Sequence, residues 1–109
     1  MAETIDYSTD IKKYTPNVNE NAVKGIVKYC GIALQSKDAS LVATTDPAER
    51  ARVRDNFMKK KLGLTDPDAA LDASIKTVTD RMKAARDKSR VTFYYLLAEM
   101  HGKLSSVGG

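Results

Sequence analysis

The stretch SRVTFYYLLAEMHGKL, residues 89–104, decides the fold of this chain. Its apolar side chains recur at i, i+4, i+7 and i+11, the spacing of one helix face: Phe93, Leu97, Met100 and Leu104. Three more apolar residues widen that face: Tyr94, Leu96 and Ala98. Because a helix that is apolar around most of its circumference must be covered, we expect it to be the most buried element. It should run from about Ser89 to Lys103, with Asp87 or Ser89 as its cap.

Two Asp-Pro pairs predict the starts of the two preceding helices. Asp46 can cap a helix whose first residue is Pro47, and Glu49 has the spacing of a capping box. Asp66 and Pro67 repeat this start twenty residues later, without a matching sequence after them. The expected buried faces are Val53, Phe57, Met58 and Leu62 in the first helix, which Gly63 ends, and Ala70, Leu71, Ile75, Val78 and Met82 in the second.

The N-terminal third predicts two more helices. The first lies within Thr4–Tyr14, where Tyr7, Ile11 and Tyr14 share a face, and Pro16 follows its end. The second begins after Asn19 as N-cap, with its apolar stripe at Val23, Ile26, Val27 and Cys30.

The end of the second helix is open to two interpretations. Gly31 is either its C-cap or a weak point inside a longer helix that reaches Leu34, and we favour the bent or interrupted helix. Residues 36–45 are polar and predict a connection with one short turn around Leu41 and Val42.

These elements predict an all-α protein, a compact irregular or orthogonal bundle of about five helices. The 109 residues suit one domain, residues 1–109, with 105–109 as a flexible tail. The polar N-terminus lacks a signal-peptide pattern, and no apolar run approaches the ~20 residues that span a bilayer. One cysteine excludes an intrachain disulfide. We therefore expect a cytoplasmic protein without a membrane partner.

The sequence gives little support to an enzyme. It contains no metal-binding, phosphate-loop, dinucleotide or paired-carboxylate motif, so we expect no catalytic residue, cofactor or metal. An enzyme built on His101 and a tyrosine has no positive evidence, because a histidine near a helix C-terminus is explained by the helix dipole. Cys30 lies on an apolar stripe and is interpreted as a packing residue.

The strongest charge feature is a basic ridge on the third helix. Its candidate nucleic-acid contacts are Arg50, Arg54, Lys59, Lys60 and Lys61. Lysines also favour the last turn of a helix, so a solvated face explains the same pattern. A second basic cluster surrounds the joint before the last helix and consists of Arg81, Lys83, Arg86, Lys88 and Arg90. Whether the two clusters meet in space is not readable from the sequence.

Residues 38–103 resemble a small bacterial family of helical proteins catalogued as a domain of unknown function. The matching features are Asp38-Ala39-Ser40, Asn56-Phe57, Lys60-Lys61-Leu62-Gly63-Leu64, Ala70-Leu71-Asp72, Ile75-Lys76 and Phe93-Tyr94-Tyr95-Leu96-Leu97. The resemblance implies a compact helical fold of about a hundred residues. It implies no catalytic residue and no ligand.

Two functions are therefore weighed. The first is a non-enzymatic protein-interaction module, with a homodimer as one form, because the last helix is too apolar to be covered by one shallow groove. The alternative is a weak nucleic-acid-binding protein that uses the basic ridge; the net charge of +4 permits such a partner without requiring it.

Overall fold

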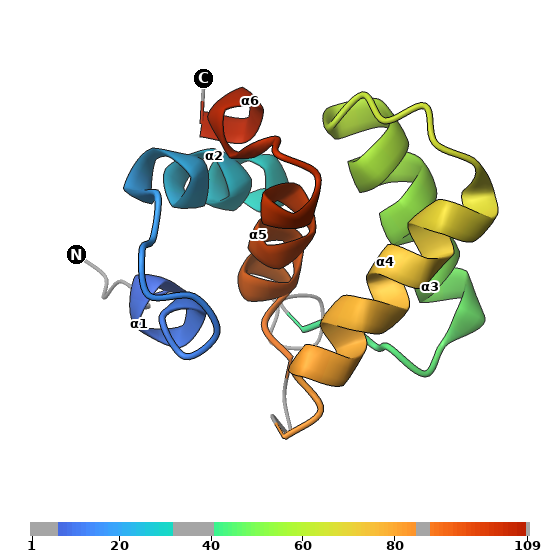
Figure 1. Ribbon diagram of the computed structural model, residues 1–109, viewed down its shortest axis with the longest axis horizontal. Coiled ribbons are helices and arrows are strands. Elements are labelled where there is room, and N and C mark those ends of the chain that lie inside the picture. Colours follow the sequence, from blue (N-terminus) through green and yellow to red (C-terminus); the bar gives the residue numbers. More distant parts are fainter. Residues whose placement is uncertain (1–6, 32–40, 85–87, 109) are drawn as a thin grey trace.

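A computed structural model describes residues 7–31, 41–84 and 88–108, and the regular elements among them are helices. In order they are α1 (Tyr7–Ile11), α2 (Glu20–Cys30), α3 (Pro47–Arg52), the π-helix η2 (Val53–Lys61), α4 (Asp68–Arg81), α5 (Arg90–Met100) and α6 (Leu104–Gly108). The predicted all-α fold is confirmed. Figure 1 shows α5 in the middle, with α1, α2 and α6 on one side and α3 and α4 on the other.

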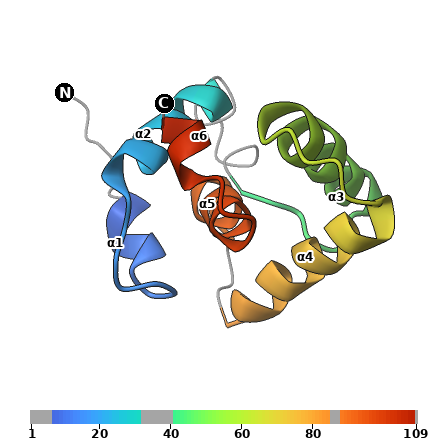
Figure 2. The ribbon, with the colours of Figure 1, turned by 45° about the horizontal axis from the view of Figure 1, so that its top comes forward.

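Helix α5 is the most buried element, as its composition predicts. Every residue from Val91 to Ala98 is buried. The helix packs against α1, α2, α4, η2 and α6, so its cover comes from both halves of the chain. The view in Figure 2, turned by 45°, again places α5 between the two groups of helices.

Both ends of α5 are fixed by local hydrogen bonds. Ser89 is the N-cap, and its hydroxyl accepts from the Thr92 amide; Asp87, the other candidate cap, lies outside the described residues. At the C-terminal end, Gly102 has φ 67°. The Gly102 amide donates to Glu99 O at 3.1 Å and the Lys103 amide donates to Ala98 O at 2.8 Å, the two bonds of a Schellman motif.

This C-cap corrects two sequence predictions. The helix ends at Met100 rather than near Lys103, so Met100 is 43% exposed and Leu104 belongs to the next helix. The segment from residue 105 was predicted to fray, but residues up to Gly108 continue α6, which packs on α2. Val107 is only 3% exposed because the turn at Gly102 returns the chain to the core.

The α3–η2 segment begins at the predicted cap, although the capping box is not formed. The Asp46 carboxylate accepts from the Ala48 amide at 2.9 Å, and Pro47 follows it in the first turn. Glu49 does not reach back to the Asp46 amide, which donates to Ala43 O instead. The Glu49 side chain turns inward and is 5% exposed.

From Val53 the helix widens into the π form, which the sequence did not predict. The Leu62 amide bonds to Phe57 O, the i→i+5 pattern of a π-helix. The predicted stripe of Val53, Phe57, Met58 and Leu62 is nevertheless buried. Gly63, at φ 71°, follows Leu62, the last residue of this stripe, as predicted.

Helix α4 starts one residue later than predicted. Pro67 has ψ 152° and is itself the N-cap, so Asp66 lies outside the helix and no side chain caps it. Four predicted core residues are buried: Leu71, Ile75, Val78 and Met82. Ala70 was predicted to be buried with them, but it is exposed.

The N-terminal helices pack onto α5 through named polar contacts. Asn19 caps α2 as predicted, and its own amide donates to the Tyr95 hydroxyl at 2.8 Å. The Thr92 hydroxyl donates to the Asp10 carboxylate, which joins α5 to α1. Ile11 is fully buried, with Tyr7 and Tyr14 packed partly against the core.

Helix α2 ends at Cys30, and Gly31 has φ 45° as its C-cap. Three predicted features lie outside the described residues: the favoured extension to Leu34, residues 36–40 of the connection, and the expected start of the first helix from Thr4. The turn expected at Leu41 and Val42 is not formed there. Leu41 instead bridges to Ser89, and the Val42 amide bonds to Lys88 O.

The packing of α6 yields a stability prediction. Val107→Ala removes buried apolar volume, so it should lower the free energy of unfolding by about 1.5 kcal/mol. Urea denaturation followed by circular dichroism measures this loss. The control Ser105→Ala, at an exposed position of the same helix, should leave the free energy of unfolding unchanged. No loss of stability in Val107→Ala would indicate a frayed tail and contradict this packing.

Candidate functional site

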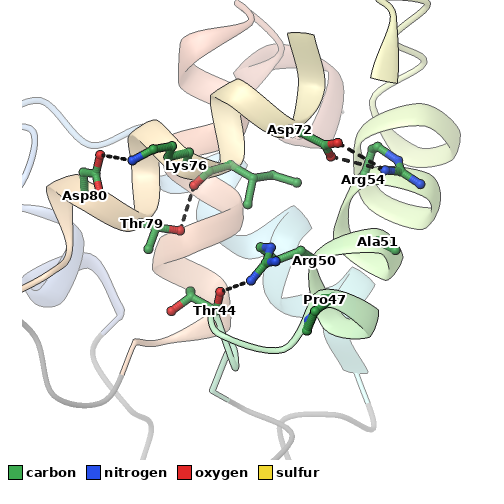
Figure 3. Close-up of a pocket in the computed structure, with 10 residues that line it drawn as sticks. Thr44, Pro47, Arg50, Ala51, Arg54, Asp72, Lys76, Thr79 and Asp80 are labelled. Carbon is green, nitrogen blue, oxygen red and sulfur yellow. Dashed lines mark hydrogen bonds and ion pairs between the residues drawn. The ribbon is translucent and has the colours of Figure 1, made fainter. Parts of the chain in front are cut away.

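The structure divides the predicted basic ridge between two hollows. Arg50 and Arg54 line a groove of about 560 Å³ between the α3–η2 segment and α4 (Figure 3). Lys61 lines a separate hollow of about 500 Å³ next to α2. The ridge was predicted from the α-helical repeat, and the π-helical winding from Val53 onward breaks that alignment.

In and beside the first groove, carboxylates of η2 and α4 pair with Arg54 and Lys59. Arg54 Nη1 lies 3.3 Å from Asp72 Oδ1, and its Nε lies 2.9 Å from Asp55 Oδ1. The hydrogen bond with Asp55, and then that with Asp72, raises the pKa of Arg54. Lys59 Nζ lies 2.5 Å from Asp68 Oδ1. The sequence did not reveal this because Asp68 and Asp72 belong to another helix.

The rest of the groove is also of mixed charge. Arg50 donates to Thr44 O at 2.7 Å, and Lys76 pairs with Asp80 at 3.3 Å (Figure 3). The lining thus carries Asp72 and Asp80 beside its three basic side chains, and each carboxylate opposes the binding of a phosphate. The groove therefore favours a polyanion less than a surface of basic side chains alone would.

The second hollow has a different composition, and we call it the lysine hollow. It is lined by Asn21, Lys24, Gly25, Lys28, Tyr29, Lys61 and Val107, from α2, the end of η2 and α6. No carboxylate is among these lining residues. Within residues 7–31, 41–84 and 88–108, no ion pair joins Lys24, Lys28 or Lys61 to an acidic side chain.

Two lysines of the hollow lie one turn apart on α2. Residues at i and i+4 share a helix face, so the ammonium groups of Lys24 and Lys28 point to the same side. Like charges at this spacing destabilise an isolated helix by a few tenths of a kcal/mol. An anion bound between them would remove that repulsion.

Tyr29 gives the hollow a fixed aromatic surface. Its hydroxyl donates to Asn56 O at 3.2 Å, and its ring centroid lies 5.6 Å from that of Phe57. The ring is still 39% exposed, and Lys61 Nζ lies 5.7 Å from its centroid. Partial burial raises the pKa of Tyr29, so the ring stays neutral at physiological pH.

Sequence reasoning missed most of this site. Lys24 and Lys28 were considered only as neighbours of Cys30, and Tyr29 only as a packing residue. The available signal was the run of two lysines at i and i+4 followed by an aromatic residue. Only the fold could show that Lys61, distant in sequence, completes the set.

Two residues of the second basic cluster, Arg81 and Arg90, make contacts within the protein. Arg81 donates to Tyr14 O at 2.7 Å and lies 3.9 Å from Glu99. Arg90 is held by Glu49, whose Oε2 lies 2.6 Å from Nη2. Arg86 lies outside the described residues.

The Glu49–Arg90 pair is a buried link between α3 and α5. Arg90 also donates to the Tyr94 hydroxyl at 2.9 Å and to Leu41 O at 3.2 Å. The other Glu49 oxygen lies 3.0 Å from Arg52 Nη2. Hydrogen bonds thus satisfy the buried Glu49 carboxylate and the largely buried Arg90 guanidinium, which is the condition under which such a pair is tolerated.

His101 and Cys30 occupy a helix-capping and a packing position. His101 is the C-cap of α5, and its Nε2 lies 2.9 Å from the Ser74 hydroxyl; it lines neither hollow. Cys30 is buried, as predicted, and desolvation raises the pKa of its thiol to about 11. The described residues contain no cluster of His, Cys, Asp and Glu able to hold a metal ion. None of their helices is long and apolar enough to cross a bilayer.

The raised pKa of Cys30 predicts a slow thiol. At pH 8 the native protein should react with a disulfide reagent such as DTNB far more slowly than the unfolded chain, because little thiolate forms and the sulfur is covered. Absorbance at fixed reagent concentration measures both rates. Equal rates in native buffer and in denaturant would contradict this placement.

The buried pair predicts a large effect of one substitution. Glu49→Ala leaves the Arg90 guanidinium buried without its carboxylate, so it should lower the free energy of unfolding by about 3 kcal/mol. The control Lys76→Ala removes an exposed pair and should cost less than about 1 kcal/mol. Equal losses in urea denaturation would show that the pair is not the link described.

The family of this chain follows from comparison with known proteins. A search of curated proteins gave no match. The family model described as a protein of unknown function, DUF2853, matches residues 6–105, nearly the whole chain. This agrees with the resemblance found over residues 38–103 and extends it through the N-terminal helices. The chain therefore belongs to the DUF2853 family of proteins of unknown function.

Proposed function

We propose that this protein is a non-enzymatic nucleic-acid-binding protein that holds phosphates weakly through the lysine hollow and the adjacent Lys60. The observation that carries the proposal is the set of three lysines around one hollow without a lining carboxylate. Phosphate groups are the natural ligands of such a set, since each bound phosphate releases counterions from the nucleic acid.

The distribution of the other charges supports this choice. Arg54, Lys59 and Arg90 each lie within ion-pair distance of an aspartate or glutamate. The chain still carries a net charge of +4. In the predicted ridge, Arg54 and Lys59 pair with aspartates and Arg50 donates to the Thr44 carbonyl, whereas no ion pair among the described residues joins Lys60 or Lys61 to a carboxylate.

A protein-interaction module remains the second candidate function. The reason for expecting a homodimer no longer applies. That form was inferred from an apolar last helix in need of cover, and α5 is covered within one chain. Among the described residues, the large hydrophobic side chains that are exposed are Tyr29 and Met100. Two such positions make a poor basis for an apolar interface.

We propose that the protein acts in the cytoplasm. Nucleic acid is available there. The single cysteine is a buried free thiol, which suits a reducing compartment.

Salt dependence tests the proposal directly. Anisotropy titrations with labelled DNA and RNA should show binding whose logarithm falls with log salt by about 0.7–0.9 for each phosphate contacted. The triple variant Lys24→Gln, Lys28→Gln, Lys61→Gln should reduce that slope by about 2.

A second triple variant controls for net charge. Lys12→Gln, Lys76→Gln, Lys83→Gln removes the same charge from exposed positions elsewhere and should keep most of the slope. Binding that is absent, independent of salt, or equally reduced by both triple variants would contradict a site at the lysine hollow.

A further inference from the structure

The lysine hollow combines cations with an aromatic ring, a pairing that a purely electrostatic surface does not need. Tyr29 is one of only two exposed large hydrophobic side chains among the described residues. It lines the hollow together with Lys24 and Lys28 of α2 and Lys61 of η2. Aromatic platforms beside basic side chains are the arrangement by which unpaired bases are held.

We infer that the lysine hollow binds single-stranded nucleic acid, with one base stacked on Tyr29 and neighbouring phosphates on Lys24, Lys28 and Lys61. This inference rests on the proposed function and specifies its ligand. Stacking on Tyr29 adds a contact with a base, which the lysines alone cannot provide.

The Tyr29 ring is prepared for stacking before a ligand arrives. Its hydroxyl bond to Asn56 O and its contact with Phe57 hold the ring, so little side-chain entropy is lost on binding. Lys61 Nζ lies over the ring at 5.7 Å, which shows that a polar group can occupy that face. A base that takes this place releases the Lys61 ammonium to a phosphate.

The spacing of the lysines suits a strand that passes along α2. Lys24 and Lys28 are separated by one turn, about 6 Å along the helix axis. Successive phosphates of an extended single strand are similarly spaced, so each ammonium can meet its own phosphate. A base between them then points toward the Tyr29 wall.

A duplex does not offer its bases in this way. Its bases are stacked and paired, and bringing one to Tyr29 requires unstacking and unpairing it. The single strand has no such cost, and any base can stack because each has a π face. The hollow should therefore prefer single strands with little sequence preference.

Three Tyr29 variants and three probes test the inference. The probes are labelled dT12, a 12-base-pair duplex and inorganic polyphosphate, which carries phosphates without bases. Y29L should weaken dT12 binding by about five- to tenfold with the salt slope kept, because stacking rather than charge is lost. Y29F keeps the ring and should bind dT12 within about twofold of the unmodified chain. Neither variant should change binding of the duplex or of polyphosphate.

A fluorescence signal provides evidence that does not depend on Y29L folding. The chain has no tryptophan, so Y29W places a single reporter in the hollow. Titration with dT12 should quench its emission, and polyphosphate should not. Thermal melting of each variant establishes that it is folded before binding is measured.

The outcomes separate this inference from the proposed function. If all three probes bind with the same salt-dependent affinity and Y29L changes none of them, the stacking role is overturned while phosphate binding stands. If dT12 leaves the Y29W emission unchanged while it binds, the base is not at Tyr29. If no probe binds at low salt, both the inference and the proposed function fail.

Discussion

Helix α5 has no solvent-facing side between Val91 and Ala98, and the rest of the fold follows from the need to cover it. A helix apolar on one stripe needs one partner, whereas this one needs partners all around. The chain supplies them from α1, α2 and α6 on one side and from η2 and α4 on the other. This explains why segments far apart in sequence converge on one central rod.

The enclosure of α5 also decides what remains outside. With most of the described large apolar side chains used internally, several charged side chains form pairs across neighbouring helices. Arg54 with Asp72 and Lys59 with Asp68 join η2 to α4 in this way. The lysine hollow differs because no acidic residue lines it, and that difference is the basis of the functional proposal.

Much of the fold could be predicted from the sequence because its signals are local. The caps at Asn19 and Asp46 were recognised, and Ser89 was one of two candidates for α5, since a capping side chain bonds an amide within three residues of itself. Helix periodicity gave the buried faces, and the breadth of the apolar arc gave the central position of α5. One error came where a long-range contact competes with a local one: Glu49 turns inward to Arg90 rather than closing a capping box.

The site was less predictable than the fold, for a related reason. The basic residues along one helix were visible in the sequence. Helix packing decides that Asp68 and Asp72 pair with two of them and that Lys61 lies beside Lys24 and Lys28. The π-helical winding moved the ridge residues further from their expected alignment. Tyr29 could not be recognised as a platform until its exposure and its neighbours were known.

The fold depends on the enclosure of α5 within a single chain. Native-state hydrogen exchange tests this enclosure most directly. Amides from Phe93 to Ala98 should exchange only by global unfolding, with the highest protection in the chain. That protection should not change over about a hundredfold range of protein concentration, since a second copy is not needed to cover the helix. Fast exchange in α5, or protection that rises with concentration, would contradict the account.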